Sequence, residues 1–248
     1  MVTRIGAIVL IYACTVVAWM ILGATVEQRT GAQDENLKTA VTQLWGTAQS
    51  QQAPQVYYQT QKQKQVVTNE NGKIVTKTEI ETTNHPLLLD GSEINVSLNL
   101  EHRQKGLLWY STYRVGFDAK YRIVNYTDQP QEIFLNFAFP TAQGVYDNFR
   151  FAIGGREEPN LQVNGGKLSG KMKLDPGKSE TVEVAYQSQG LDEWWYDFGE
   201  NVKQAKNFSL AMTTDFDRID FPPSSISPTR KDKTANGWLL TWQYASLL

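Results

Sequence analysis

The residues able to perform nucleophilic or metal chemistry are few and scattered in this chain. It holds one cysteine, Cys14, inside an uncharged N-terminal run, and two histidines, His85 and His102. A nucleophile needs a neighbouring general base, yet no glycine-flanked serine motif occurs and the only thiol lies in the apolar run. No pair of histidines or cysteines has the spacing of zinc ligands. The sequence therefore predicts no catalytic residue, no metal and no cofactor, and favours a protein that is not an enzyme.

One acidic cluster supplies the remaining catalytic hypothesis. Asp215, Asp217 and Asp220 alternate with apolar residues over 213–221, and a strand there could place two carboxylates on one face, for calcium binding or for hydrolysis. Glu193 is a further candidate carboxylate. Because no glycine-bearing calcium loop accompanies the cluster, we interpret it as the solvated face of a strand. A hydrolase with paired carboxylates stays as an alternative.

Aromatic side chains are the most distinctive feature of the polar part of the chain. Trp194, Trp195 and Tyr196 are consecutive, and Trp109 and Tyr110 form a second pair. Such rings combine apolar area with a polar edge and can line binding surfaces. A strand turns adjacent residues to opposite faces, so at least one ring of the run should enter a core. These five residues are the candidate interaction surface, and an exposed planar array of them would indicate a carbohydrate-binding or cell-wall-binding module.

A hydrophobic segment at the N-terminus predicts where the protein acts. Residues 5–24 carry no charge and match the roughly 20 residues that a helix needs to cross a bilayer. The end of this run, Leu22-Gly23-Ala24-Thr25, fits the small-residue cleavage site of a signal peptide poorly. We therefore expect a retained transmembrane helix over 5–25, with a cleaved signal peptide as the alternative.

Charge and cysteine content bear on partners and orientation. The chain has 24 basic and 26 acidic residues, with a formal charge of −2, which does not suit nucleic acid as a partner. Arg4, Arg29 and Lys38 lie on both sides of the hydrophobic segment and do not decide its orientation. The chain after Cys14 has no thiol, as is common in exported domains. We predict that residues 1–4 are cytoplasmic and that the body lies outside the cytoplasm.

Residues 26–65 are expected to connect the membrane helix to the body. An apolar stripe at helical spacing, from Leu37 to Ala48, predicts a short amphipathic helix that starts near Asp34. Eight glutamines between 49 and 65 indicate a solvated connector rather than a core strand.

From residue 66 to residue 248 the apolar residues alternate with a period of two. Two short β-branched runs, 66–68 and 74–76, flank Asn71-Gly72 and predict a β-hairpin. The alternation over 113–123 predicts the longest two-faced strand, which should be central in its sheet. Further strands are expected around 94–100, 133–139, 149–153, 161–163, 171–174, 182–186, 208–212 and 238–242.

Many short strands separated by turn residues argue for a mainly β fold, an antiparallel β-sandwich, with no helix after Trp45. Two packed β subdomains that divide near Gly190 are the alternative arrangement. In either case the β domain over 66–248 is preceded by one transmembrane helix and a short amphipathic helix.

The order of short motifs resembles the CreD-like family of bacterial inner-membrane proteins. After the apolar segment come Glu27-Gln28-Arg29 and then Trp45-Gly46-Thr47-Ala48-Gln49, similar to the family's juxtamembrane arginine and Trp-Gly-x-x-Gln signature. Residues 102–113 (HRQKGLLWYSTY) resemble its arginine-rich segment with a Gly-hydrophobic-Tyr pattern. The family places several transmembrane helices after its soluble domain, whereas this chain ends at Leu248. The resemblance implies an inner-membrane location, a periplasmic body and an association with envelope integrity, and it implies no catalytic residues.

These observations predict a membrane-anchored, non-enzymatic protein of the cell envelope. Its expected partners are the membrane, through the N-terminal helix, and other envelope proteins or multi-pass membrane proteins, through the body. The carbohydrate-binding module and the carboxylate hydrolase are the alternative functions.

Overall fold

The computed structural model describes residues 2–70, 73–105, 108–142, 144–158, 162–199, 202 and 204–247. Within these residues the protein is mainly β, with one long helix before the strands. The elements are α1 (Val2–Trp45), β1 (Gln49–Gln52), β2 (Gln55–Glu70), β3 (Lys73–Leu87), β4 (Gly91–Lys105), β5 (Leu108–Val124), β6 (Gln131–Ala138), β7 (Asp147–Ile153), β8 (Arg156–Glu157), β9 (Gln162–Asn164), β10 (Lys167–Leu174), β11 (Ser179–Leu191), β12 (Trp194–Asp197), β13 (Ala205–Thr214), β14 (Arg230–Lys233) and β15 (Trp238–Leu247).

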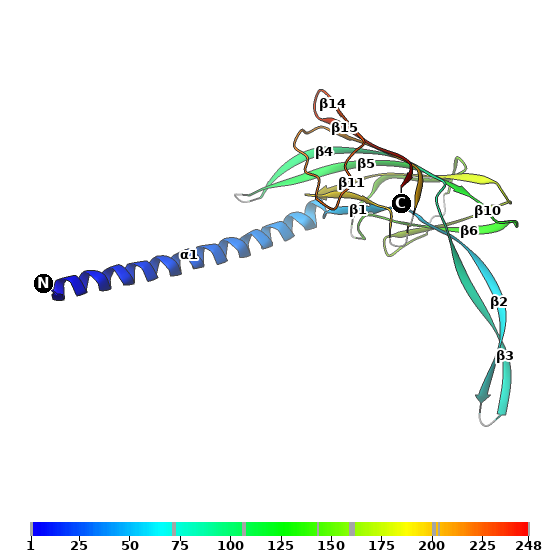
Figure 1. The fold of residues 1–248 in the computed structure, drawn as a ribbon, viewed down its shortest axis with the longest axis horizontal. Helices are drawn as coiled ribbons and strands as arrows, with labels where there is room; N and C mark the ends of the chain where they lie inside the picture. The colour runs from blue at the N-terminus through cyan, green and yellow to red at the C-terminus, as the bar shows by residue number, and fades with distance from the viewer. Residues whose placement is uncertain are drawn as a thin grey trace.

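Helix α1 projects from one end of the β body as a single rod (Figure 1). Its segment Thr3–Ala32 is long and apolar enough to cross a membrane, and its most apolar stretch is covered by no other part of the protein. A signal sequence near an N-terminus meets the same description. The predicted membrane helix and the predicted amphipathic helix from Asp34 are one continuous element. No proline separates them, and Gly31 weakens a helix by only about 1 kcal/mol.

Two sheets pack face to face in the β body. The smaller has the order β3-β2-β6-β10-β9, and the larger has the order β14-β15-β13-β4-β5-β11-β7-β8. The predicted sandwich is confirmed, although not every neighbouring pair is antiparallel. Strands β13 and β4 run parallel in the larger sheet, and β1 and β12 form a separate parallel pair.

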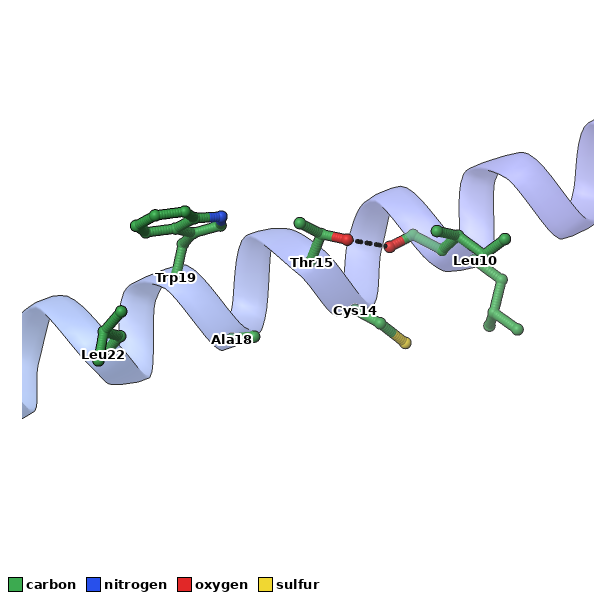
Figure 2. A pocket seen from close by; sticks show the side chains of 7 residues that line it. Leu10, Cys14, Thr15, Ala18, Trp19 and Leu22 are labelled. Atoms are coloured by element: carbon green, nitrogen blue, oxygen red, sulfur yellow. Dashed lines mark hydrogen bonds between the residues drawn. The ribbon is translucent and has the colours of Figure 1, made fainter.

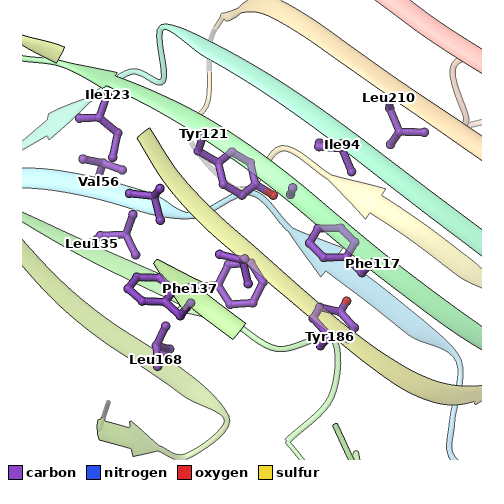
Figure 3. Packing of buried hydrophobic residues seen from close by; sticks show 14 of the residues in the cluster. Val56, Ile94, Phe117, Tyr121, Ile123, Leu135, Phe137, Leu168, Tyr186 and Leu210 are labelled. Atoms are coloured by element: carbon purple, nitrogen blue, oxygen red, sulfur yellow. The ribbon is translucent and has the colours of Figure 1, made fainter. Parts of the chain in front are cut away.

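The predicted central strand is confirmed as β5, which pairs with β4 on one side and β11 on the other. Phe117 points into the core with 2% of its surface exposed, whereas the Asp118 side chain on the other face is 46% exposed and pairs with Arg150. The Phe117 ring stacks on Tyr186 at 4.9 Å and lies 6.4 Å from Phe137 of the smaller sheet (Figure 3). The core therefore joins the two sheets.

The alternative of two subdomains dividing near Gly190 does not describe this fold. Strand β11 continues through Gly190 to Leu191 and pairs with β5 along that length. Strands that precede and follow Gly190 share the larger sheet, so the body has one sandwich.

The predicted hairpin is confirmed as β2 and β3, which extend far from the sandwich (Figure 1). They pair continuously from Val56 with Leu87 to Glu70 with Lys73. Strand β6 supports β2 only over residues 55–58, so the outer part is a two-stranded ribbon. The side chains of residues 61–65 and 78–84 are exposed. The expected turn, Asn71-Gly72, lies outside the described residues.

Two predicted boundaries are wrong. Strand structure begins at Gln49 rather than at residue 66, because the glutamine-rich segment finds strand partners in β12, β3 and β6. The strand expected over 213–221 also ends early, since β13 stops at Thr214 and the acidic cluster follows it without strand structure.

Candidate interaction site at the helix–sandwich junction

The end of α1 is seated directly against the larger sheet. Gly46 closes the helix with a backbone hydrogen bond from its N–H to Thr42 O at 2.9 Å. Its φ of +95° favours glycine. A Cβ at this position would also lie 2.4 Å from the carbonyl oxygen of Gln189. The next residue, Thr47, accepts a hydrogen bond from Leu191 N at 3.1 Å. Only glycine permits this close approach of helix and strand.

An apolar contact reinforces the junction one turn earlier on the helix. Val41 is 1% exposed and forms a small core with Tyr110 and Leu191, and Leu37 packs against its edge. Leu37 and Val41 are four residues apart, on one face of the helix. The predicted apolar stripe is therefore confirmed at Leu37 and Val41. These two side chains pack the last turns of α1 against the ends of β5 and β11.

Strand β1 then carries two fully buried glutamines into the body. Gln49 Nε2 donates to Gln189 O at 2.7 Å, and its Oε1 accepts from Ser188 Oγ at 3.0 Å. Gln51 Nε2 donates to Ala138 O at 3.0 Å, and its Oε1 accepts from Tyr186 OH at 2.8 Å. Each amide uses both ends, as a buried polar group requires. Through Gln51, β1 bridges the two sheets.

Sequence reasoning missed these two residues as core positions. Glutamine is usually exposed, and eight of them together suggested a solvated segment. The period-two spacing of Gln49 and Gln51 on either side of exposed Ser50 is the pattern of a strand face. That spacing was the available signal.

The aromatic run lies on β12, beside β1. Trp194 pairs in register with Gln49, and Tyr196 pairs with Gln51. Trp194 and Tyr196 pack against the main core. The Trp195 side chain alternates to the other side, where its Nε1 donates to Glu193 Oε2 at 3.0 Å. The run is therefore divided between core and surface, as the alternation of a strand requires.

The second aromatic pair is divided in the same way. Tyr110 is buried against the helix, whereas Trp109 is 65% exposed. Of the five residues predicted as an interaction surface, Trp109 is exposed, and Trp195 is half-buried outside the main core. Trp194, Tyr196 and Tyr110 pack into the body, so these five residues do not form the exposed planar array that would indicate a sugar-binding face.

Buried tyrosine hydroxyls complete the junction. Tyr113 OH donates to the carbonyl oxygen of Glu193, and Tyr186 OH donates to Gln51. Burial away from water raises the pKa of Tyr113, Tyr121 and Tyr186 above the ordinary value of 10.0. These phenols therefore stay protonated at neutral pH and act as hydrogen-bond donors.

Three of the candidate carboxylates, Asp215, Asp217 and Glu193, have separate partners. Asp215 accepts hydrogen bonds from Asn99 Nδ2 at 3.2 Å and Leu100 N at 2.8 Å. Asp217 forms an ion pair with Lys233, while Glu193 is bound to Trp195. Among the described residues, no group of three or more His, Cys, Asp or Glu side chains could hold a metal ion.

The histidines and the cysteine are also apart from one another. His85 stacks on Tyr58 at 4.8 Å and lies 2.8 Å from Thr60 Oγ1, and His102 is exposed on β4. Cys14 lines a shallow hollow on α1 whose walls are the helix's own side chains, including Leu10 and Trp19 (Figure 2). This hollow lies on the apolar segment and encloses no polar group suited to fix a ligand.

No protein-family model and no curated protein matches the chain. Among solved structures, a protein from Legionella pneumophila described as a candidate nutrient binding protein is similar, with a TM-score of 0.40 and 9% sequence identity. The match covers 64% of this chain and 64% of that chain, so it spans less than two thirds of either protein.

Proposed function

We propose that this protein is a non-enzymatic component of the bacterial cell envelope, anchored in the inner membrane by α1, with its β-sandwich in the periplasm. The observation that carries the proposal is the uncovered apolar segment Thr3–Ala32, which continues without a break into the helix end that docks on the sandwich. Water is a poor environment for such a surface, and lipid is a good one.

In this proposal the anchor also orients the sandwich, because the junction between α1 and the sandwich is closely packed. Gly46, the Val41 contact and the buried glutamines fix the direction in which the sandwich leaves the helix. A body held in this way keeps one orientation relative to the helix. This suits a protein that contacts other envelope proteins or multi-pass membrane proteins.

The proposed contact surface includes Trp195, whose ring is half-buried outside the main core. A large ring near a protein surface contributes most when a partner covers it. Trp194, its neighbour, packs against the core and should serve stability instead. The two residues therefore make a matched pair for separating binding from folding.

The test compares Trp195→Ala with Trp194→Ala in the full chain in native membranes, measuring melting temperature and the proteins that crosslink to each variant. We expect Trp195→Ala to melt like the wild type and lose a crosslinked partner. Trp194→Ala should be destabilised by roughly 2–4 kcal/mol, because it truncates a ring packed on the core. Two stable variants that both retain every partner would remove the aromatic run from the function.

The proposal agrees with the CreD-like resemblance, which implies an envelope-integrity role. The resemblance itself is tested by genetics: deletion of the gene in its native host should weaken the envelope, measured as sensitivity to detergent. A deletion strain as resistant as its parent would separate this chain from that role.

A further inference from the structure

The far end of the β4–β5 hairpin has an unusual composition for an exposed strand end. Residues 101–114 contain three cationic side chains and one carboxylate, together with the exposed Trp109. Glu101 pairs with Arg103 and with Arg114, at 2.8 Å from the Arg114 Nε. Lys105 forms no ion pair within the described part of the chain. Lys105 and the exposed Trp109 lie at the same end of the hairpin, on opposite faces of it. Lysine and tryptophan side chains are both common where a protein meets the headgroup layer of a membrane.

The fold directs this end back along the helix. Tyr110 of β5 packs against Val41, and the last paired residues, Lys105 and Leu108, lie beyond Tyr110 along the hairpin. In Figure 1 the ends of β4 and β5 point toward the N-terminal part of α1. The hairpin therefore returns from the junction toward the apolar segment.

Element dimensions place the hairpin end close to the membrane surface. From Ala24, where the uncharged run ends, to Val41 the helix rises about 25 Å. The hairpin returns about 7 Å of this between Tyr110 and Leu108, and the headgroups occupy roughly 5–8 Å above the hydrocarbon. The remaining gap of about 10 Å is comparable to one Debye length at physiological salt.

Helix tilt would narrow this gap. Membrane-spanning helices are commonly tilted by about 20°, and the uncharged run over residues 5–24 can adopt such a tilt in the bilayer. A tilt toward the hairpin lowers its end by a few ångströms, and the long side chains of Lys105 and Trp109 extend further toward the headgroup layer.

We propose that the end of the β4–β5 hairpin is a second membrane contact, in which Lys105 binds anionic phospholipid headgroups and Trp109 lies in the interfacial layer. This contact rests on the proposed anchoring of α1. Two attachment points would fix the tilt and rotation of the sandwich over the membrane, which a single helix leaves free.

The test measures the depth of a fluorophore on a single cysteine in the full chain. The probe is attached through Gln104→Cys in a Cys14→Ser background, which keeps Lys105 and Trp109. The matched control is Ile80→Cys, an exposed position on the β2–β3 hairpin, remote from α1. Both proteins are reconstituted in phosphatidylcholine vesicles with one quarter phosphatidylglycerol and a lipid that carries a nitroxide on its headgroup.

We expect strong quenching at position 104 and little at position 80. Adding Lys105→Glu, or omitting phosphatidylglycerol, should reduce the occupancy of the contact about fivefold, since one basic residue near an anionic surface contributes on that scale. Trp109→Ala should reduce the quenching as well. Equal, weak quenching at positions 104 and 80 would overturn the contact.

A probe on the native Cys14 separates this failure from failure of the anchor. Cys14 lies within the apolar segment and should be quenched by a nitroxide deep in the acyl chains. Quenching at Cys14 without quenching at position 104 overturns the hairpin contact alone. Absence of quenching at Cys14 overturns the anchored protein and the hairpin contact together.

Discussion

Two neighbouring glutamine-rich segments of this chain have opposite environments. In β1, Gln49 and Gln51 are 1% and 0% exposed, and their amides bond to groups in the body. In the outer part of β2, residues 61–65 are all exposed and face only the partner strand β3. Glutamine makes up three of the four residues of β1 and three of the five residues of 61–65, so glutamine content did not determine burial.

The difference comes from the partners that each segment meets. A buried amide is tolerated only where both its donor and its acceptor are satisfied, and β1 meets the free carbonyl of Ala138 and the hydroxyl of Tyr186 at the right distances. The outer β2–β3 ribbon meets no third strand and stays in water. Glutamine is thus a structural residue in β1 and a solubilising one in β2.

The largest expected loss of stability follows from substitution of a buried glutamine in β1. Gln51→Leu should lower the free energy of unfolding by about 3 kcal/mol, because it strands the Tyr186 hydroxyl and the Ala138 carbonyl without partners. Gln63→Leu, on the exposed ribbon, should change it by less than about 0.5 kcal/mol. Denaturant unfolding of the full chain in detergent micelles measures both. Equal losses would mean that the β1 network contributes nothing specific.

The next effect concerns how the helix delivers β1 to its place. Gly46→Ala should destabilise the junction by about 1–3 kcal/mol, since it combines a positive φ with a Cβ placed against Gln189. Gly31→Ala has open space around it and should be neutral or slightly stabilising. Protease cleavage between α1 and the sandwich reports the difference. A Gly46→Ala protein as resistant as the wild type would contradict the tight junction.

A smaller effect should appear at alkaline pH. Burial raises the pKa of Tyr113, Tyr121 and Tyr186 in the folded protein above 10.0, so the unfolded chain loses phenolic protons first. Stability from this source is complete below pH 10 and is lost as the pH rises above it. The free energy of unfolding should therefore fall between about pH 10 and pH 12.

Removing one of these phenols sharpens the pH prediction. Tyr186→Phe should make the alkaline decline shallower while lowering stability at pH 7 by about 1–3 kcal/mol, because Gln51 loses its donor. Unfolding curves recorded from pH 7 to the alkaline range measure both effects. A decline as steep as that of the wild type would show that Tyr186 does not contribute.

The smallest effect belongs to the exposed ribbon. Lys64 and Glu81 lie 4.0 Å apart with side chains more than half exposed, a geometry in which an ion pair contributes little. Glu81→Gln should leave the melting temperature within about 1 °C of the wild type. A larger loss would show that the ribbon is held by its charges.

The sequence predicted most of the sandwich because alternation reports burial directly. Tyr113 to Ile123 gave the central strand, and the runs around Asn71-Gly72 gave the hairpin. It failed at Gln49 and Gln51, because the acceptors and donors that bury them lie 87 to 140 residues away in the chain. Distant pairing of this kind leaves no local pattern.

The sequence identified the aromatic residues of the candidate site but not which of their rings are buried. Alternation along a strand correctly divides Trp194 from Trp195, but it does not say which ring enters the core, since that depends on the pairing of β12 with β1. Tyr110 is a predicted surface residue that is buried in the structure, and its burial follows from the docking of α1. The positions of Lys105 and Trp109 relative to the helix likewise depend on that docking.

The central claim is that α1 anchors the sandwich outside the cytoplasm, and the most direct measurement is a reporter fused after Leu248. Alkaline phosphatase needs disulfides, so it is active only where they form. We predict an active fusion in cells, with the protein retained in the membrane fraction. An inactive phosphatase fusion at normal expression, together with an active cytoplasmic reporter at the same position, would contradict the account.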